Sequence, residues 1–376
     1  MPAPPLSLYV HLPWCVRKCP YCDFNSHEAH GIPEREYVNA LLHDLRRDAP
    51  LAGGREIRSV FIGGGTPSLF SAEGIATLLA GLRREVAFAA DVEITLEANP
   101  GSAEGEKFHG FRAAGVNRLS LGIQSFDAEK LRALGRVHDP DQALAAVEFA
   151  ETARFDSFNI DLMHGLPGQD VEAALADLRM AILCAPAHLS WYQLTIEPNT
   201  VFHNRPPLLP VEEELANIQD EGEKVLDFAG YRQYEISAYS RRGKQCRHNL
   251  NYWQFGDYLG VGAGAHGKVT DAHGDVWRYT KTRMPADYMR AQDPTAQRHQ
   301  VPRDELAGEF MLNALRLNAG FALADFEART CLSREVLAPG IQRQVDNGLL
   351  ECDGDRVRAS PLGRRFLDSV IAEFFD

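Results

Sequence analysis

The sequence predicts an α/β fold, in which an incomplete (β/α)6-type barrel is followed by a small helical, winged-helix-like domain. Between residues 6 and 229, short β-branched or aromatic runs alternate with longer amphipathic runs, a pattern typical of repeated βα units. Six such short runs are present, rather than the eight strands of a closed (β/α) barrel. Beyond a polar stretch at residues 284–305, the pattern changes to helices and one hairpin.

Each βα unit is expected from its own residues. The strands are predicted at the β-branched and aromatic runs 6–12, 57–64, 92–99, 117–124, 155–165 and 188–196. The helices are predicted at amphipathic runs that often end at Gly or Pro, at residues 34–48, 71–86, 104–115 and 171–184. A doubly wound sheet would share this pattern, and both architectures place functional groups at the carboxyl ends of the strands.

The C-terminal part of the chain has its own pattern. Helices are predicted at residues 305–317, 324–330, 333–348 and 361–375. Two short strands within residues 349–360 are expected to turn at an Asp-Gly pair. The polar, proline-containing stretch 284–305 is interpreted as a linker. The acidic balance of the chain argues against a DNA-binding role for this winged-helix-like domain.

Charge and cysteine usage exclude several classes of protein. The net charge is −13 over 376 residues, and the basic residues are scattered, so no nucleic-acid partner is expected. The start of the chain lacks a signal-peptide pattern and no apolar run is long enough to cross a bilayer, so a cytoplasmic location is expected. Seven cysteines, four of them far apart, favour a metal or redox device over a disulfide framework.

The stretch "WCVRKCPYCDF" at residues 14–24 places three thiols, those of Cys15, Cys19 and Cys22, on one short loop. Zinc would need a fourth protein ligand there, which His11 or His27 could supply. An iron-sulfur cubane would bind three irons through the cysteines and leave the fourth iron open. The spacing alone leaves both centres open.

Glycines and polar residues follow the expected strands. The turn "GGGTP" comes directly after strand 57–64 and removes Cβ atoms where backbone could approach a ligand, although a plain turn before the next helix is an alternative. Glu97 closes strand 92–99 and is well placed to accept hydrogen bonds from ribose hydroxyls. Gln124, Arg136 and Asp161 follow at or after later strands. Taken singly, each of these side chains is interpreted as a surface or packing polar group.

Taken together and in this order, the three cysteines and the strand-end residues resemble the radical S-adenosylmethionine (SAM) superfamily. The resemblance implies a 4Fe-4S cluster on Cys15, Cys19 and Cys22 whose open iron chelates SAM and whose electron cleaves it to a 5′-deoxyadenosyl radical. In the porphyrin branch of this superfamily, aromatic residues also contact the cofactor or its loop. The SAM site that the resemblance implies consists of Tyr9, Tyr21, Gly64, Gly65, Thr66, Glu97, Gln124, Arg136 and Asp161.

A second motif lies in "CRHNLNYWQFGDYLGVGAGAHG", residues 246–267. His248, Asn249, Tyr252 and Trp253 resemble the His-Asn-x-x-Tyr-Trp motif of HemW-type heme chaperones, which belong to the same porphyrin branch. A neutral imidazole is a normal axial ligand of heme iron, so the resemblance implies that His248 binds heme near the mouth of the barrel. The alternative is a histidine that only packs in an aromatic cluster.

Two lesser residues in this stretch are expected to be structural. Cys246 is interpreted as a plain buried cysteine, because the c-type Cys-x-x-Cys-His signature is absent. His266 is interpreted as part of a glycine-rich strand turn rather than as a ligand.

Two departures separate the chain from its enzymatic relative, the oxygen-independent coproporphyrinogen III oxidase. That enzyme resembles this chain but has a further cysteine where Phe24 stands, and a longer region before the cluster. The resemblance therefore implies a heme chaperone of the HemW type, with a barrel at residues 1–230, an extension at 231–290 that carries the second motif, and a HemN-like helical domain at 303–376.

The expected partners are heme and heme-acceptor proteins such as respiratory enzymes, and the resemblance leaves membrane-associated acceptors and a homodimer open. Two other functions stay open. The first is a coproporphyrinogen III oxidase, which would remove carbon dioxide from the propionate side chains of its substrate by radical chemistry. The second is a structural zinc protein built on a βα domain.

Overall fold

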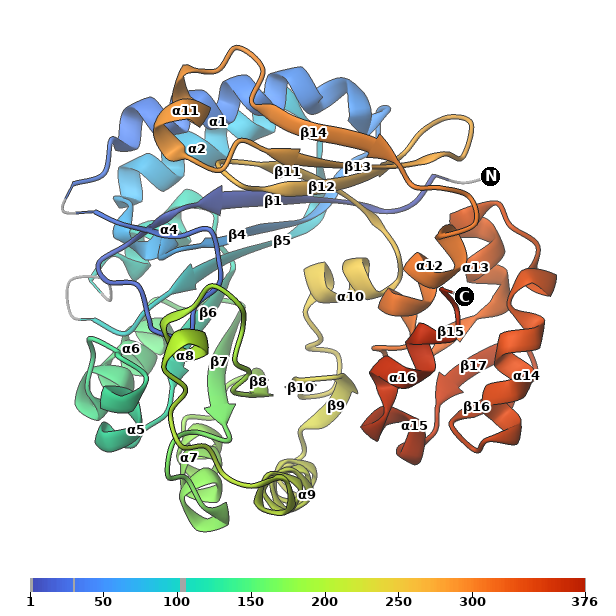
Figure 1. Cartoon of the computed structure of the whole chain (residues 1–376). Coiled ribbons are helices and arrows are strands. Elements are labelled where there is room, and N and C mark those ends of the chain that lie inside the picture. The colour runs from blue at the N-terminus through green and yellow to red at the C-terminus, as the bar shows by residue number, and fades with distance from the viewer. Residues whose placement is uncertain (1–2, 30, 102–105, 376) are drawn as a thin grey trace.

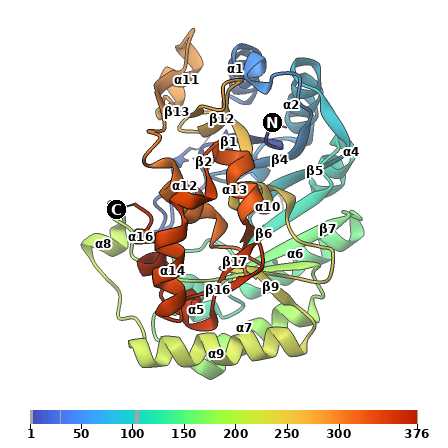
Figure 2. The ribbon, with the colours of Figure 1, turned by 90° about the vertical axis from the view of Figure 1, so that its right-hand side faces the viewer.

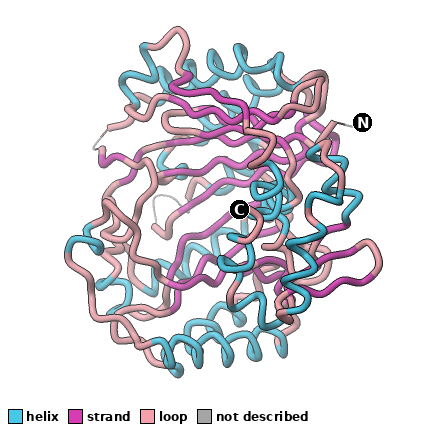
Figure 3. Tube along the Cα trace, turned by 45° about the vertical axis from the view of Figure 1, so that its right-hand side comes forward, coloured by secondary structure: helices cyan, strands magenta, loops and turns pink. Residues whose placement is uncertain are grey.

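The computed structural model describes residues 3–29, 31–101 and 106–375, and one sheet of twelve strands organises them (Figure 1). The strand order is β14-β13-β12-β11-β1-β4-β5-β6-β7-β8-β10-β9, and the sheet curves so that helices cover its outer face (Figure 3). The six expected strands are all present, and they form its parallel centre: β1 (Leu6–Leu12), β4 (Ile57–Gly64), β5 (Phe88–Ala98), β6 (Arg118–Gln124), β7 (Ser157–His164) and β8 (His188–Gln193).

The helices of the barrel pack against the outer face of these strands. The expected ones are α1 (Glu34–Asp48), α2 (Ala72–Glu85), α4 (Phe108–Ala114) and α7 (Val171–Leu183); the expected start of α4, at residues 104 and 105, lies outside the described residues. Further helices that the sequence pattern did not single out are α5 (Ala128–Ala133), α6 (Pro140–Thr152), α8 (Val201–Asn204) and α9 (Glu212–Phe228). Short 3-10 turns lie at Ala49–Ala52 and Pro67–Leu69.

The sheet continues beyond β1 and beyond β8. Next to β1 lies β11 (Asp257–Val261), which runs parallel to it although some 250 residues separate the two in sequence. The edge then turns antiparallel through β12 (His266–Thr270), β13 (Val276–Lys281) and β14 (Thr295–Gln300), and the other edge carries β10 (Ala238–Ser240) and β9 (Arg232–Glu235). Among the described strands, β14 and β9 do not pair with one another, so the barrel is open, as predicted.

The stretch at residues 284–305 is not a linker. It contains α11 (Pro285–Arg290) and the edge strand β14. Tyr288 is buried, and its hydroxyl donates a hydrogen bond to Asp44 at 2.7 Å, which ties α11 to α1. β14 lies at the edge of the sheet and its side chains are largely exposed, which is consistent with the polar composition that suggested a linker.

The C-terminal domain stands beside the open side of the barrel (Figure 2). Its elements are α12 (Leu306–Ala314), β15 (Phe321–Ala322), α13 (Leu323–Thr330), a 3-10 turn at Arg334–Val336, α14 (Ala338–Asp346), β16 (Leu350–Asp353), β17 (Arg356–Ala359), α15 (Pro361–Arg365) and α16 (Leu367–Ala372). The expected hairpin is therefore present, whereas the single closing helix expected at 361–375 is two short helices separated at Phe366.

Two hydrophobic cores hold the chain together. One fills the space between the barrel strands and their outer helices, and the other lies within the C-terminal domain. Phe255 and Val276, which precede the C-terminal domain in sequence, belong to the second core. The proposed boundaries at residues 230 and 303 stay predictions. No described helix is both long enough and apolar enough to span a bilayer.

Candidate functional site

The three expected cluster cysteines lie on the loop that follows β1. Two short strands, β2 (Trp14–Cys15) and β3 (His27–Glu28), pair in parallel and clamp the two ends of this loop. All three thiols are free, Cys15 is buried, and Cys19 and Cys22 are half-buried. The loop thus presents three thiols on one short, anchored segment.

Hydrogen-bond donors from two different parts of the chain, the turn after β4 and the segment after α5, point at these sulfurs. The Thr66 hydroxyl donates to Cys15 Sγ at 3.7 Å, and an Arg136 guanidinium N–H donates to Cys19 Sγ at 3.6 Å. Burial raises the pKa of Cys15 and of Cys22, so these thiols favour the protonated form until a positive centre binds them. Donors placed on sulfur stabilise bound thiolates, which fits a metal or iron-sulfur centre.

One of the two histidines that could complete a zinc site at the cysteine loop is already in use. Both ring nitrogens of His11 are occupied, Nδ1 by the Tyr9 hydroxyl at 2.8 Å and Nε2 by the Asn25 carbonyl at 2.9 Å, so His11 is not a free fourth ligand. Over the described residues, the one group of His, Cys or acidic side chains whose ligand atoms all lie within 4.8 Å of one another is Glu93, Cys246 and His248. The three loop thiols are therefore not all within 4.8 Å of one another.

The glycine turn after β4 presses against the cysteine loop. The backbone N–H of Gly65 donates to the Leu12 carbonyl at 2.8 Å, and that of Thr66 donates to the Trp14 carbonyl at 2.7 Å. A Cβ atom on Gly65 would lie 2.5 Å from the Trp14 carbonyl oxygen, so any other residue at this position would clash with the loop backbone. Gly64 has a φ of +119°. These glycines therefore allow the turn to lie close to the cysteine loop, and the predicted approach to a ligand stays a prediction.

Glu97 lies at the end of β5 with one described hydrogen bond, from the backbone N–H of Gly64 to Oε2 at 3.1 Å. Burial, together with the negative charge of Asp161, raises the pKa of Glu97 to about 8. A buried carboxylate that is short of donors is a suitable acceptor for the hydroxyl groups of a ribose. Its surroundings thus fit the ligand expected there.

Asn99 joins two of the predicted residues, and the sequence pattern did not single it out. Its Nδ2 donates to Thr66 Oγ1 at 2.8 Å, and its Oδ1 accepts from Arg136 at 2.6 Å. Arg136 also donates to the Gly122 carbonyl at 2.6 Å. A small cavity of about 40 Å³ lies among Cys19, Thr66, Asn99 and Arg136 and their neighbours. Thr66, Arg136 and the cysteine loop therefore meet at the carboxyl ends of the strands, as the sequence predicts.

Two further predicted SAM residues, Gln124 and Asp161, each accept hydrogen bonds from other side chains of the chain. Gln124 has a φ of 71°, and its Oε1 accepts from the Tyr192 hydroxyl at 2.7 Å. Asp161 accepts from Ser120 Oγ at 3.1 Å and from Asn159 Nδ2 at 2.7 Å, so its carboxylate belongs to a polar network inside the barrel.

The two predicted aromatic contacts differ in their surroundings. Tyr9 stacks on Phe61 at 5.9 Å between ring centroids and lines a large cavity beside the loop. Tyr21 packs against Phe202 at 6.4 Å on the opposite side of the loop.

His248, the predicted heme ligand, is enclosed by its neighbours, and its role as a ligand stays a prediction. It sits on α10 (Arg247–Trp253), its side chain is only 8% exposed, and its ring packs on Phe61 at 4.1 Å inside the barrel. Its Nδ1 lies 2.8 Å from Cys246 Sγ and 3.6 Å from Glu93 Oε1. The orientation has a local cause: Glu93 Oε1 accepts the backbone N–H of Arg247 at 2.9 Å, which holds the start of α10 against β5.

A cavity of about 780 Å³ opens between the cysteine loop, α10 and the strands β12–β14. Phe24, the residue that stands in place of a further cysteine, lines this cavity and is 64% exposed. Tyr252 and Trp253 from the second motif line it as well, whereas His248 does not. Burial and the nearby positive charges of Arg278 and Arg283 lower the pKa of His266, which lines the same cavity.

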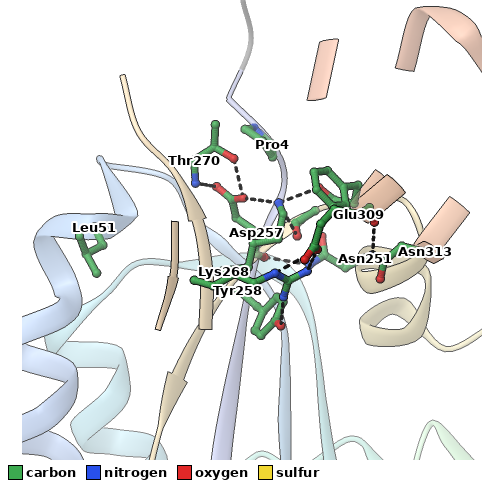
Figure 4. A network of polar contacts seen from close by, with 12 residues as sticks. Pro4, Leu51, Asn251, Asp257, Tyr258, Lys268, Thr270, Glu309 and Asn313 are labelled. Atoms are coloured by element: carbon green, nitrogen blue, oxygen red, sulfur yellow. Dashed lines mark hydrogen bonds and ion pairs between the residues drawn. The ribbon is translucent and has the colours of Figure 1, made fainter. Parts of the chain in front are cut away.

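The floor of this cavity is held by a buried polar network (Figure 4). Asp257 accepts hydrogen bonds from Lys268 at 3.0 Å, from Arg55 at 2.6 Å and from the backbone N–H of Thr270 at 2.8 Å. Arg278 pairs with Glu309 of α12, which links the sheet to the C-terminal domain. Because these charges are paired, the floor is preorganised without a ligand.

The comparisons with known proteins extend over the whole chain. Residues 9–181 match the radical SAM superfamily, and residues 301–366 match the HemN C-terminal domain. The chain is 50% identical over 372 residues to the heme chaperone HemW of Escherichia coli (strain K12), covering 99% of this chain and 98% of that relative. It is 38% identical over 385 residues to the mitochondrial radical S-adenosyl methionine domain-containing protein 1 of Mus musculus, covering 97% of this chain and 86% of that relative.

A solved structure also resembles the whole chain. The radical SAM enzyme coproporphyrinogen III oxidase (HemN) from Escherichia coli superposes with a TM-score of 0.82 at 25% identity, covering 100% of this chain and 91% of that one. The cysteine loop, the barrel and the C-terminal domain thus all lie within the matched region.

Proposed function

Because the chain belongs to the HemW family of the radical SAM superfamily, we propose that it is a heme chaperone that binds heme and passes it to acceptor proteins. The observation that carries the heme part is the 780 Å³ cavity, which lies directly beside the cysteine loop and is walled by aromatic and basic side chains. Its volume falls within the roughly 300–1,000 Å³ typical of sites for organic ligands of this size class.

The cysteine loop is proposed to hold a 4Fe-4S cluster through Cys15, Cys19 and Cys22. When bound, the cluster with SAM on its open iron supplies one-electron chemistry. Thr66 and Arg136 are proposed to stabilise the cysteine thiolates through the donors that reach Cys15 and Cys19. The chain's own contribution is thus a fixed loop with donors already aimed at sulfur.

The SAM site is proposed at the carboxyl ends of β4–β7. Gly64, Gly65 and Thr66 would supply backbone groups, and Glu97 would accept hydrogen bonds from the ribose. Arg136 is held by Asn99 in a position facing the loop. Other residues proposed to contact SAM or to shape its site are Tyr9, Tyr21, Gln124 and Asp161, of which Asp161 lies deeper in the barrel network.

Phe24 supports a chaperone rather than a decarboxylating enzyme. The resemblance implies a cysteine at this position in the decarboxylating enzyme, and here an exposed aromatic side chain lines the cavity instead. An aromatic ring can pack against a porphyrin and shield the cluster from solvent. The ligand that the resemblance implies, His248, would reach this cavity only after α10 moved, because its ring is enclosed in the barrel.

The proposed acceptors are heme proteins such as respiratory enzymes, including membrane-associated ones, and the proposed location is the cytoplasm. A homodimer is also proposed. Heme transfer between proteins requires an accessible site, and the exposed rings and cations at the rim of the cavity are consistent with that requirement.

Oxygen-independent coproporphyrinogen III oxidase is the second candidate. The full-length structural similarity to HemN, with a TM-score of 0.82, supports it. Both functions need a site for a tetrapyrrole beside the cluster, so the cavity alone does not separate them. The two functions are distinguished by whether the protein converts coproporphyrinogen III.

The test uses the cluster-loaded, full-length protein under anaerobic conditions. Heme is titrated and followed by absorption, and the heme-loaded protein is then mixed with an apo-acceptor. A saturable Soret band that moves to the acceptor is the expected result. In a parallel assay with SAM and a reductant, coproporphyrinogen III should stay unconverted; conversion without stable heme binding would overturn the chaperone proposal in favour of the oxidase.

A further inference from the structure

We propose that the iron of bound heme is ligated by His266 and that a heme propionate pairs with Arg283, both within the 780 Å³ cavity. This inference rests on the proposed heme binding and assigns its site. The residues come from two parts of the second half of the chain: His266 begins β12, and Arg283 follows β13.

The imidazole of His266 is directed into the cavity by the pleat of β12. Side chains alternate between the two faces of a strand, so His266 and Lys268 share one face, and both line the cavity. Gly267 faces the other way, where a Cβ atom would lie 2.1 Å from the ring of Tyr279. The glycine therefore packs against an aromatic ring on one face while the histidine stays open on the other.

His266 is also chemically available. Over the described residues, no hydrogen bond to either of its ring nitrogens is recorded, and the side chain is exposed at the cavity. Every other imidazole at this site is in use or enclosed: His11 is bonded at both nitrogens, and the ring of His248 is packed against Phe61. A neutral imidazole with a free nitrogen is the usual protein ligand of heme iron.

The basic side chains that line the cavity also differ in whether they already pair with a carboxylate. Lys268 pairs with Asp257, Lys281 with Asp44 and Asp48, and Arg278 with Glu309. Among the basic residues that line the cavity, Arg283 is the one with no carboxylate partner in the described part of the chain, and it is exposed. A guanidinium in this state can accept a ligand carboxylate in a bidentate pair.

The walls suit a flat, apolar macrocycle. Tyr252 and Trp253 come from α10, and Phe24 comes from the cysteine loop. These aromatic side chains with one free imidazole and one free guanidinium match a ring that carries a metal at its centre and carboxylates at its edge. In this arrangement Tyr252 and Trp253 of α10 contact the porphyrin, while His248 of the same helix stays a structural residue of the barrel.

The experiment compares heme with iron-free protoporphyrin on the full-length, cluster-loaded protein and on His266→Ala, Arg283→Gln and His248→Ala. A matched control is His299→Ala, an exposed histidine on neighbouring β14 that does not line the cavity. Binding is followed by the Soret band and by quenching of tryptophan fluorescence, and far-UV circular dichroism checks that each variant is folded.

His266→Ala should weaken heme binding about tenfold or more and change the Soret and charge-transfer bands, while protoporphyrin binding changes little because the ring contacts remain. Arg283→Gln should weaken the binding of both heme and protoporphyrin. His299→Ala should weaken the binding of neither. His248→Ala should leave the heme spectrum unchanged.

Two failures are distinguishable. If the unmodified chain binds no heme, the proposed function fails and this inference fails with it. If the unmodified chain binds heme but His266→Ala gives the same spectrum and affinity, heme binding stands and His266 is not the ligand. Loss of the heme spectrum in a folded His248→Ala protein, with His266→Ala unchanged, would assign the iron to His248 instead.

Discussion

Glu97 is a buried acid whose surroundings raise its pKa into the neutral range. It receives one described hydrogen bond, from Gly64, and it faces the negative charge of Asp161. Without a ligand, the carboxyl group therefore keeps its proton until the pH reaches about 8. Ligand hydroxyl groups that donate to it would favour the ionised form, so ligand binding at this acid is expected to release a proton.

Replacing Glu97 with Gln should raise the stability of the ligand-free protein at alkaline pH. The folded pKa is about 8 and the model-peptide value is 4.5, so the folded state binds more protons between these two values. Glu97 therefore lowers the free energy of unfolding as the pH rises through this window, by at most ~1.4 kcal/mol per pH unit. Urea unfolding at about pH 5 and about pH 8 measures the difference.

The control for this prediction is Glu148→Gln, which changes an exposed acid on α6. That variant should follow the pH dependence of the unmodified chain. A Glu97→Gln profile that parallels the unmodified one between pH 5 and pH 8 would mean that Glu97 is ionised in the folded protein.

Asn99→Ala should weaken SAM binding to the cluster-loaded protein by about tenfold, because the side chain makes two hydrogen bonds, each contributing ~1 kcal/mol, that hold Thr66 and Arg136 in place. Equilibrium dialysis with labelled SAM measures the affinity. Asn117→Ala is a control that removes an asparagine bridging β5 and β6 away from the cysteine loop. If Asn99→Ala binds SAM as tightly as the unmodified chain does, Arg136 needs no support from Asn99.

Sequence patterns could predict the strand-end residues but not all of their partners. The carboxyl ends of parallel strands meet at one edge, which is why the turn after β4, Glu97 and the cysteine loop were expected together. The role of Asn99 depends on a contact with Arg136 across 37 residues, which no local spacing encodes. The burial of His248 could not be predicted, because a seven-residue helix can present its histidine to either side and the Glu93 hydrogen bond to the start of α10 decides which.

At the scale of elements, a buried ion cluster connects the antiparallel strands β12–β14 to helix α1. Lys281 of β13 contacts Asp44 at 2.6 Å and Asp48 at 2.8 Å, both on α1, and the lysine side chain is fully buried. Tyr288 of α11 donates to the same Asp44. Burial raises the pKa of Asp44, so the positive charge of Lys281 is what allows this carboxylate to stay ionised.

Lys281→Met should destabilise the protein by roughly 3–5 kcal/mol, since it leaves buried acids without their cation. The free energy of unfolding from urea denaturation checks this value. The matched control is Arg47→Ala, which removes an exposed pair with Asp293 that also connects α1 to the part of the chain that forms β12–β14. That change should cost less than ~1 kcal/mol. A loss of similar size in the two variants would contradict the assignment of Lys281 as a buried anchor.

The elements that sequence patterns missed share a physical cause. The parallel core strands are buried on both faces and stand out as apolar runs, and all six were predicted. β14 is almost wholly exposed and polar, so nothing in its composition separates it from a loop. β9 and β10 have four and three residues, which is too short for periodicity to appear.

At the scale of the whole molecule, the C-terminal domain shares its core with the rest of the chain. Phe255 and Val276 are each 1% exposed and pack within the core of that domain. Arg278 and Glu309 add an ion pair across the same boundary. Although the change of pattern near residue 303 predicted a separate domain, its packing contacts extend across that point, which hydrophobic periodicity cannot reveal.

Deleting residues 303–376 should therefore expose Phe255 and Val276, lower the midpoint of thermal unfolding and cause self-association. Differential scanning fluorimetry and size-exclusion chromatography measure these two effects. Phe366→Ala in the full-length chain is a control, because this ring is 55% exposed and its loss should change neither quantity much. A shortened chain that is monodisperse and as stable as the full chain would contradict the shared core.

The parallel pairing of β1 with β11 has a consequence for the synthesis of the protein on the ribosome. β1 is synthesised long before β11, because the strand that covers its second edge begins only at Asp257. At roughly 5–20 residues per second, this edge waits about 12–50 s for its partner. During that interval the nascent chain carries an apolar strand with unpaired backbone groups, and the cysteine loop directly follows it. We therefore expect the nascent chain to be prone to pairing with other chains at this edge, and the cluster loop to reach its final surroundings only after residue 261 has been made.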